Sequence, residues 1–306
     1  MSQEQKSRHA EGVAAALVGA ISWGFSGTCV QYLFSSTTLD PLLLTTIREL
    51  GAGIVFLLVL LVKRREQLRE MLADRETLRG LAIFGSFGLF LNSAVYATTI
   101  SYTNAGTATV LQSLNIVFVL AIACVTAQRA PRRLEVVALV CALLATFLIA
   151  THGDPTTIKM PVMGLVFGIA TAAAATFYTM YPRRMFQRWG SFAVTGVGMF
   201  VGGLTGIVVC AANGTLAAGL PSLDATSLVV MVIAILVGTF AAYGLYLHGI
   251  SIVGPLWGNM LGAAEPVSAT VISALWLHTA FSGADWAGLV LMVATIMLVA
   301  LESHAK

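Results

Sequence analysis

The chain consists mainly of apolar runs that are each about as long as a lipid bilayer is thick. A helix needs roughly 20 apolar residues to cross the hydrocarbon core, and 306 residues leave room for ten such helices with short loops. Apolar runs can be placed at 11–34, 41–62, 80–100, 104–127, 133–151, 162–181, 191–212, 225–248, 252–277 and 284–302. The sequence therefore predicts an all-α integral membrane protein with ten transmembrane helices.

The composition excludes several other classes of protein. Only 10% of the residues are charged, whereas a water-soluble domain carries about 25%. No basic run with interleaved aromatic residues is present, so we expect no nucleic-acid partner. Four cysteines lie inside apolar runs and form no CxxC pair, and we expect them to be buried apolar residues. These are Cys29, Cys124, Cys141 and Cys210.

The basic residues predict how the chain is oriented in the membrane. The loops at 63–79, 128–133 and 182–190, together with the two termini, hold 15 of the 17 lysines and arginines. Loops rich in lysine and arginine stay on the cytoplasmic side. We therefore expect a multi-pass protein of the cytoplasmic (inner) membrane with both termini in the cytoplasm. Segment 63–79 is either a short helix on the membrane surface or a solvated basic loop.

The two halves of the chain resemble each other at an offset of 150 residues. Tyr96 then meets Tyr246, and Glu135 meets Asp285, without a gap over about 55 positions. Each half holds five spans, an odd number, so the second half must enter the membrane with the opposite orientation. We expect two five-helix inverted repeats, at 1–151 and 160–306. Such repeats are typical of secondary transporters, whose shared midplane site opens to each side in turn.

Four motifs inside the apolar runs carry a resemblance to a known family. They are Ile21-Ser22-Trp23-Gly24-Phe25, Arg48-Glu49-Leu50-Gly51-Ala52-Gly53, Leu261-Gly262-Ala263-Ala264-Glu265-Pro266-Val267-Ser268-Ala269 and Asp285-Trp286-Ala287-Gly288. Through them the chain resembles the drug/metabolite transporter superfamily, EamA type, over essentially its whole length. Two departures stand out, at 277–279, where the family often has Leu-Gly-Glu, and at Ile116, where it often has proline.

The resemblance implies a function as well as a fold. The commonest activity of the family is export of amino acids or related metabolites, so we expect a secondary transporter of a small molecule. Import or exchange of a small metabolite or an organic cation is the alternative within this class. A membrane scaffold that transports nothing, or an intramembrane enzyme, is the alternative from another class.

Ionisable residues inside the spans are the first candidates for the site. Glu265 lies near the middle of a span, where an ionised side chain costs roughly 3 kcal/mol, and Pro266 disturbs the helix beside it. Glu265 is either a substrate or proton site, or a hydrogen-bonding partner of a neighbouring helix. Arg48 and Glu49 lie two turns inside the second span. Arg48 either binds a carboxylate of the substrate, pairs with a carboxylate on another helix, or extends outward to the membrane surface. We expect Glu265, Arg48 and Glu49 to be candidates for proton or cation coupling.

Polar and aromatic residues inside the spans are the other candidates. Asn115 is the counterpart of Glu265 in the first repeat, and Gln112 lies on nearly the same helix face. These amides either line a cavity or form hydrogen bonds to a neighbouring helix. Aromatic residues inside the spans, including Tyr243, form a second set of candidates. They either line a cavity for an apolar or cationic substrate or pack against their neighbours. The expected substrate-binding residues are Trp23, Asn92, Tyr96, Gln112, Asn115, Tyr178, Tyr246, Trp257 and Glu265.

The sequence contains no motif of an ATPase or of a common enzyme class. No P-loop, GxSxG or HExxH motif is present. We therefore expect no enzymatic activity, no cofactor and no metal, and transport driven by a gradient, by exchange or by facilitated movement. The expected partners are a small-molecule substrate and the lipid bilayer, with the protein either a monomer or a homodimer.

Overall fold

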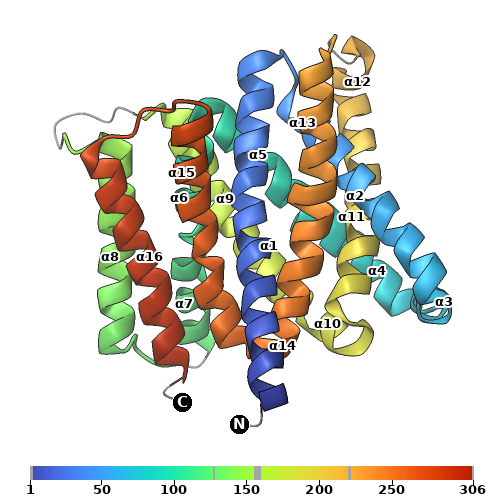
Figure 1. Ribbon diagram of the computed structural model, residues 1–306, viewed down its shortest axis with the longest axis horizontal. Helices are drawn as coiled ribbons and strands as arrows, with labels where there is room; N and C mark the ends of the chain where they lie inside the picture. Colours follow the sequence, from blue (N-terminus) through green and yellow to red (C-terminus); the bar gives the residue numbers. More distant parts are fainter. Residues whose placement is uncertain (1–2, 127, 155–159, 220–221, 305–306) are drawn as a thin grey trace.

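The protein is a bundle of helices (Figure 1). The computed structural model describes residues 3–126, 128–154, 160–219 and 222–304, and none of these residues lies in a strand. Within these ranges, seven helices are long and apolar enough to cross a membrane. The prediction of an all-α integral membrane protein is therefore confirmed, whereas the count of ten spans stays a prediction.

The first half of the chain contains eight α-helices and one π-helical segment. They are α1 (Gln3–Ser36), α2 (Pro41–Lys63), α3 (Arg65–Ala73), α4 (Arg75–Ile83), η1 (Phe84–Phe90), α5 (Leu91–Tyr102), α6 (Ala105–Gln112), α7 (Asn115–Thr126) and α8 (Arg133–Thr151). The α4, η1 and α5 segments follow one another without a break. The short helix α3 lies in the basic segment 63–79 and buries Leu68 and Met71.

The second half has a similar, though not identical, order of helices. It contains α9 (Val162–Met180), α10 (Arg183–Trp189), α11 (Ser191–Ala212), α12 (Thr215–Ala218), α13 (Ala225–Ile235), η2 (Leu236–Ala241), α14 (Ala242–Gly262), α15 (Ala264–Trp276) and α16 (Gly283–His304). The start of α1 and the end of α16 lie at the same end of the bundle as α3 and α10 (Figure 1). We call this the basic end, because three of the basic segments meet there.

Helix starts recur at the offset of 150 residues that the sequence shows. The pairs α2 and α11, α4 and α13, and α8 and α16 each begin 150 residues apart. Aspartates cap α4 and α13 at equivalent positions: Asp74 accepts hydrogen bonds from Glu76 N and Thr77 Oγ1, and Asp224 accepts one from Ser227 N. The Thr77 hydroxyl, aided by backbone N–H groups, lowers the pKa of Asp74, and Ser227 lowers the pKa of Asp224. These caps define where each span starts.

One span boundary differs from the expected position. The sequence predicts spans at 225–248 and 252–277, yet α14 continues without interruption to Gly262, and the break lies at Ala263. Gly249, at the expected boundary, instead packs against α1, where an added Cβ would lie 2.6 Å from the carbonyl oxygen of Gly12. A glycine in the sequence can therefore suggest a turn where the structure instead uses it for close contact between two helices.

Glycines also bring α1 against α15. An added Cβ at Gly24 would lie 2.6 Å from both the carbonyl oxygen of Glu265 and the backbone nitrogen of Ala269. Small residues at helix contacts allow such close approach of two backbones in a membrane protein. Gly24 thereby fixes the distance between α1 and the helix that carries Glu265.

Candidate functional site

A cavity of about 380 Å³ lies in the middle of the bundle. Both halves of the chain line it, with residues from α1, α2, α5, α6, α9, α10, α11, η2, α14 and α15 among others. The structure brings together most of the residues expected from the sequence. Those in the lining are Trp23, Arg48, Glu49, Asn92, Tyr96, Gln112, Asn115, Tyr178, Tyr246 and Glu265. Trp257 is the exception, because its side chain lies outside the described residues.

Arg48 is a cation that has no acidic partner among the described residues. Its Nη2 donates to Ser26 Oγ at 2.8 Å and to Thr239 Oγ1 at 3.3 Å. Its Nε is buried without a hydrogen bond, and no carboxylate of the described residues forms an ion pair with it. The alternative in which Arg48 pairs with a carboxylate on another helix is therefore not what the structure shows. The guanidinium retains donors that an anionic group in the cavity can use.

Glu49 is buried beside Arg48 but points to a different neighbour. Its side chain packs against Gly202 of α11, where a Cβ would overlap Oε2. The residue is 3% exposed, and neither carboxyl oxygen has a hydrogen-bond partner among the described residues, although Ser93 lies close by. Consecutive residues of a helix point about 100° apart, so Arg48 and Glu49 reach the cavity from two sides of α2.

Glu265 lies where a helix is interrupted. The break at Ala263 separates α14 from α15, and Glu265 is in the first turn of α15, just before the buried Pro266. Its carboxyl forms no hydrogen bond or ion pair with a described side chain. Asn115 occupies the equivalent position, as the first residue of α7 after the break at 113–114. Broken helices at a midplane site are typical of transporters, because the freed backbone groups line a cavity.

Aromatic rings form one wall of the cavity. Trp23 packs edge-on against Tyr243, with ring centroids 4.8 Å apart, and lies 4.5 Å from the ring of Tyr246. Tyr243 in turn contacts Tyr178 at 6.4 Å. The indole Nε1 of Trp23 is buried without a hydrogen-bond partner in the described residues. The wall offers π faces together with an unused donor, so it can contact an apolar or cationic group.

Amide and hydroxyl groups also line the cavity. Gln112 Nε2 donates to Asn92 Oδ1 at 3.4 Å, and the hydroxyls of Tyr96 and Thr109 share a hydrogen bond of 2.7 Å. These pairs tie α5 to α6. They therefore serve as hydrogen-bonding groups between helices and as lining of the cavity at the same time.

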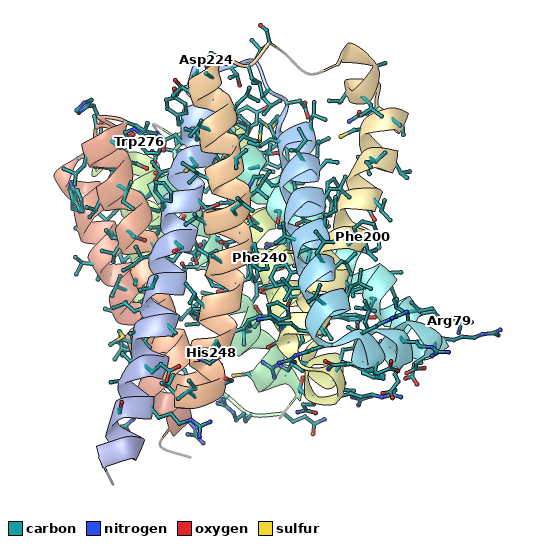
Figure 2. All side chains as sticks on the ribbon, turned by 45° about the vertical axis from the view of Figure 1, so that its right-hand side comes forward. Arg79, Phe200, Asp224, Phe240, His248 and Trp276 are labelled. Atoms are coloured by element: carbon teal, nitrogen blue, oxygen red, sulfur yellow. The ribbon has the colours of Figure 1, made fainter. Side chains whose placement is uncertain are left out.

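The cavity extends toward the basic end. Its lining includes Phe186 on α10 and both Leu247 and Ile250 on α14. Figure 2 shows His248, which lies between the last two in the chain, near this end and far from Asp224. The opposite end is tied together around Gln31 of α1, which donates to Thr279 Oγ1 at 2.8 Å and accepts from the backbone N of Ala105 at 2.9 Å.

Several lining residues could not be assigned from the sequence. Ser26, Thr45, Ser93, Thr109 and Thr239 are serines and threonines inside apolar spans, and such residues often only bond the carbonyl one turn back. Thr239 bonds the carbonyl of Ala234, five residues back, because it lies in the π-helical segment η2. Tyr243 also lines the cavity, although the sequence does not single it out from the other aromatic residues as a substrate-binding residue.

The chemistry of the cavity suits a small molecule with groups of both charges. An unpaired guanidinium can bind a carboxylate, and an unpaired carboxyl beside π faces can bind an ammonium group. No group of three or more histidine, cysteine or acidic side chains that could hold a metal is found among the described residues.

Comparisons with known proteins bear on the whole chain. The family model described as "EamA-like transporter family" matches residues 10–151 and again residues 162–301. A protein of Salmonella typhimurium named "Uncharacterized inner membrane transporter YicL" is 33% identical over 296 residues, which cover 97% of each chain. A solved structure described only as "Crystal structure of protein" is 19% identical, with a TM-score of 0.62, and the match covers 97% of this chain and 99% of the other.

Proposed function

Because the chain belongs to the EamA-like transporter family, we propose that this membrane transporter is a secondary transporter that exports an amino acid or a related metabolite by alternating access. One observation carries the proposal: the cavity in the middle of the bundle holds an unpaired guanidinium and an unpaired carboxyl, at Arg48 and Glu265. Both are costly to bury in a membrane, and a zwitterionic solute compensates both at once.

Each group has a role in this proposal. Arg48 binds the carboxylate of the solute with its free donors, while Glu265 receives the ammonium group or exchanges a proton. Trp23, Tyr243 and Tyr246 contact the side chain of the solute. Glu49, which lies deeper against Gly202, is the second carboxyl that can carry a proton or a cation.

Alternating access requires two halves that exchange conformations. The recurrence of helix starts at an offset of 150 residues supports a two-repeat origin. In Figure 1, α8 rises from the basic end and α16 descends toward it, which supports the opposite orientation of the halves. The structure would represent the state that is open toward the basic end, with the opposite end closed around Gln31.

Membrane placement follows from the charges. The basic end carries α3, α10, the start of α1 and the end of α16 (Figure 1), so we assign it to the cytoplasm by the positive-inside rule. The likeness to a protein named an inner membrane transporter supports the cytoplasmic membrane. A cavity that is open to the cytoplasm is ready to load a cytoplasmic solute, which agrees with export.

Counterflow in proteoliposomes tests the function. Purified protein is reconstituted with unlabelled amino acids inside, and entry of the labelled solute is measured over a broad panel. We expect exchange of at least one amino acid, lost in Arg48→Ala, and a pH dependence that disappears in Glu265→Gln. Glu70→Gln, on the exposed side of α3, is the matched control and should behave as wild type. If no solute exchanges, the transport function is refuted. If Glu265→Gln keeps the wild-type pH dependence, the role of Glu265 is refuted.

Transport of an organic cation is the second candidate. The two unpaired carboxyls, Glu49 and Glu265, together with the wall around Trp23, favour a positively charged solute. The same panel includes quaternary ammonium compounds, in both loading directions. Exchange of these compounds that survives Arg48→Ala would favour the cation transporter over the amino acid exporter.

A further inference from the structure

A second hollow lies outside the central cavity, at the basic end of the bundle. Its volume is about 760 Å³, and it lies between the start of α4 and the segment formed by the end of α9 and α10. Figure 2 shows Arg79 at the margin of the bundle on this side. Four arginines line the hollow: Arg75, Arg79, Arg184 and Arg188. The proposed transport cycle makes no use of these residues.

Most of the positive charge in this pocket is uncompensated. Arg188 forms an ion pair with Asp74 at 2.6 Å and lies over the ring of Trp189 at 4.9 Å. The other three arginines form no ion pair with a described residue, and Glu76 is the only acidic residue in the lining. The pocket therefore presents a surplus of guanidinium groups to an incoming ligand. Guanidinium groups bind phosphate oxygens through paired hydrogen bonds.

The walls of the pocket are held in fixed positions. The indole Nε1 of Trp189 donates to Thr77 Oγ1 at 3.0 Å, and Gln67 Nε2 donates to the backbone oxygen of Trp189 at 2.6 Å. Together with the Asp74–Arg188 pair, these bonds join α3, α4 and α10. The arginines of α4 and α10 therefore lie on two helices that these bonds hold at a fixed distance from each other.

Part of the pocket lining is apolar and reaches the exposed surface of a candidate membrane span. Ile83 and Met185 line it, and Ile83 is 42% exposed, two turns inside the candidate span 75–102. A ligand in this pocket meets arginines at the level where α4 begins and apolar side chains farther along the same helix. An amphiphile with an anionic head and a hydrocarbon tail satisfies both, whereas a free phosphate leaves the apolar part uncovered.

We propose that this pocket binds the phosphate headgroup of an anionic phospholipid, with Arg75, Arg79 and Arg184 around the phosphate and Ile83 and Met185 against the start of the acyl chain. Basic pockets between helices on the cytoplasmic side suit such headgroups. The bound lipid would bridge α4 and α10, and so connect the two halves of the chain at the end toward which the cavity extends.

Lipid titration of the purified full-length protein tests the site. Short-chain phosphatidylglycerol and phosphatidylcholine of equal chain length are titrated, and native mass spectrometry counts the retained lipids. The variant Arg75→Gln/Arg79→Gln/Arg184→Gln removes the pocket charges. The control Arg64→Gln/Arg65→Gln/Arg69→Gln removes the same charge from exposed positions beside and on α3. Equal melting temperatures in phosphatidylcholine show that all variants are folded.

Selective loss of affinity would support the site. Each basic side chain near an anionic lipid contributes about a fivefold factor, so we expect the pocket variant to bind phosphatidylglycerol roughly 100-fold more weakly and the control variant to bind as wild type. Equal losses of affinity for phosphatidylglycerol in both variants would show diffuse electrostatic attraction and would overturn the proposal. Unchanged affinity in both variants would also overturn it. If inorganic phosphate competes as well as phosphatidylglycerol does, the ligand is a soluble phosphate and the lipid assignment is wrong.

Discussion

Gly24→Ala is expected to disturb the contact that positions Glu265. The new Cβ would lie 2.6 Å from the carbonyl oxygen of Glu265 and 2.6 Å from the backbone nitrogen of Ala269, and would also overlap Ser268 Oγ. Ordinary contacts of a carbon atom lie near 3.5 Å or beyond, so the shortfall is about 1 Å. Two of the three atoms are backbone, so a rotamer change cannot relieve the overlap, and α15 has to move away from α1.

The expected cost follows from two opposing effects. Overpacking of this kind destabilises by about 1–3 kcal/mol, while alanine stabilises a helix by about 1 kcal/mol relative to glycine. Because rigid backbone opposes the new methyl group, we expect a net destabilisation of about 1–2 kcal/mol. Displacement of α15 also moves Glu265 relative to Trp23, so the counterflow rate should fall as well.

Gly244→Ala is the matched control for this measurement. Gly244 lies in α14 and an added Cβ there meets no atom within 4 Å, so the variant gains helix propensity without an overlap and should be slightly more stable than wild type. Thermal unfolding in one detergent compares the two variants. If Gly24→Ala is as stable as Gly244→Ala, or exchanges solute at the wild-type rate, then α1 and α15 do not pack as closely as described.

Three further results are expected. Gln31→Leu should destabilise the protein by about 1–3 kcal/mol, because it leaves the buried N–H of Ala105 without an acceptor; Gln31→Glu, which keeps the acceptor, should lose less in the same thermal assay. Arg48→Lys keeps the charge but loses the paired donors, so carboxylate solutes should compete about 10-fold more weakly in counterflow, and unchanged competition would refute their binding at Arg48. The pKa of Asp224 is lowered in the folded state, so its contribution to stability is complete above the unfolded pKa of about 4 and is lost as pH falls through the folded pKa. Asp224→Asn should therefore make the melting temperature vary less between pH 6 and pH 3. A melting temperature that depends on pH as in the wild type would contradict this role.

The helical fold could be predicted from apolar length, since lipid forces backbone groups to bond within a helix. The starts of several spans carry recognisable signals, such as Asp40 and Asp224, which cap α2 and α13. The boundary near 249 could not be predicted, because glycine is equally suited to a turn and to close packing against α1. The π-helical segments η1 and η2 have no sequence signal of their own, since their apolar composition matches that of the flanking α-helices.

The residues of the candidate site that could be predicted are those whose burial in a membrane costs the most free energy. Arg48, Glu49 and Glu265 are conspicuous in an apolar span because an ionisable group there needs compensation, and the structure places all three at the cavity. Ser26 and Thr239 were not predictable, because hydroxyls are common in membrane helices and their partner, the guanidinium of Arg48, comes from a distant part of the chain. Which neighbour Arg48 contacts depends on helix packing, which the order of residues does not reveal.

The two π-helical segments determine which side chains face the central cavity. A π turn contains one residue more than an α turn, so each helix beyond it is rotated by about 100° relative to an uninterrupted α-helix. Asn92, Ser93 and Tyr96 follow η1, and Tyr243 and Tyr246 follow η2. Each half of the chain thus contains one π-helical segment that sets which face of the following helix lines the cavity, and a deletion within that segment would turn a different face of the helix toward the cavity.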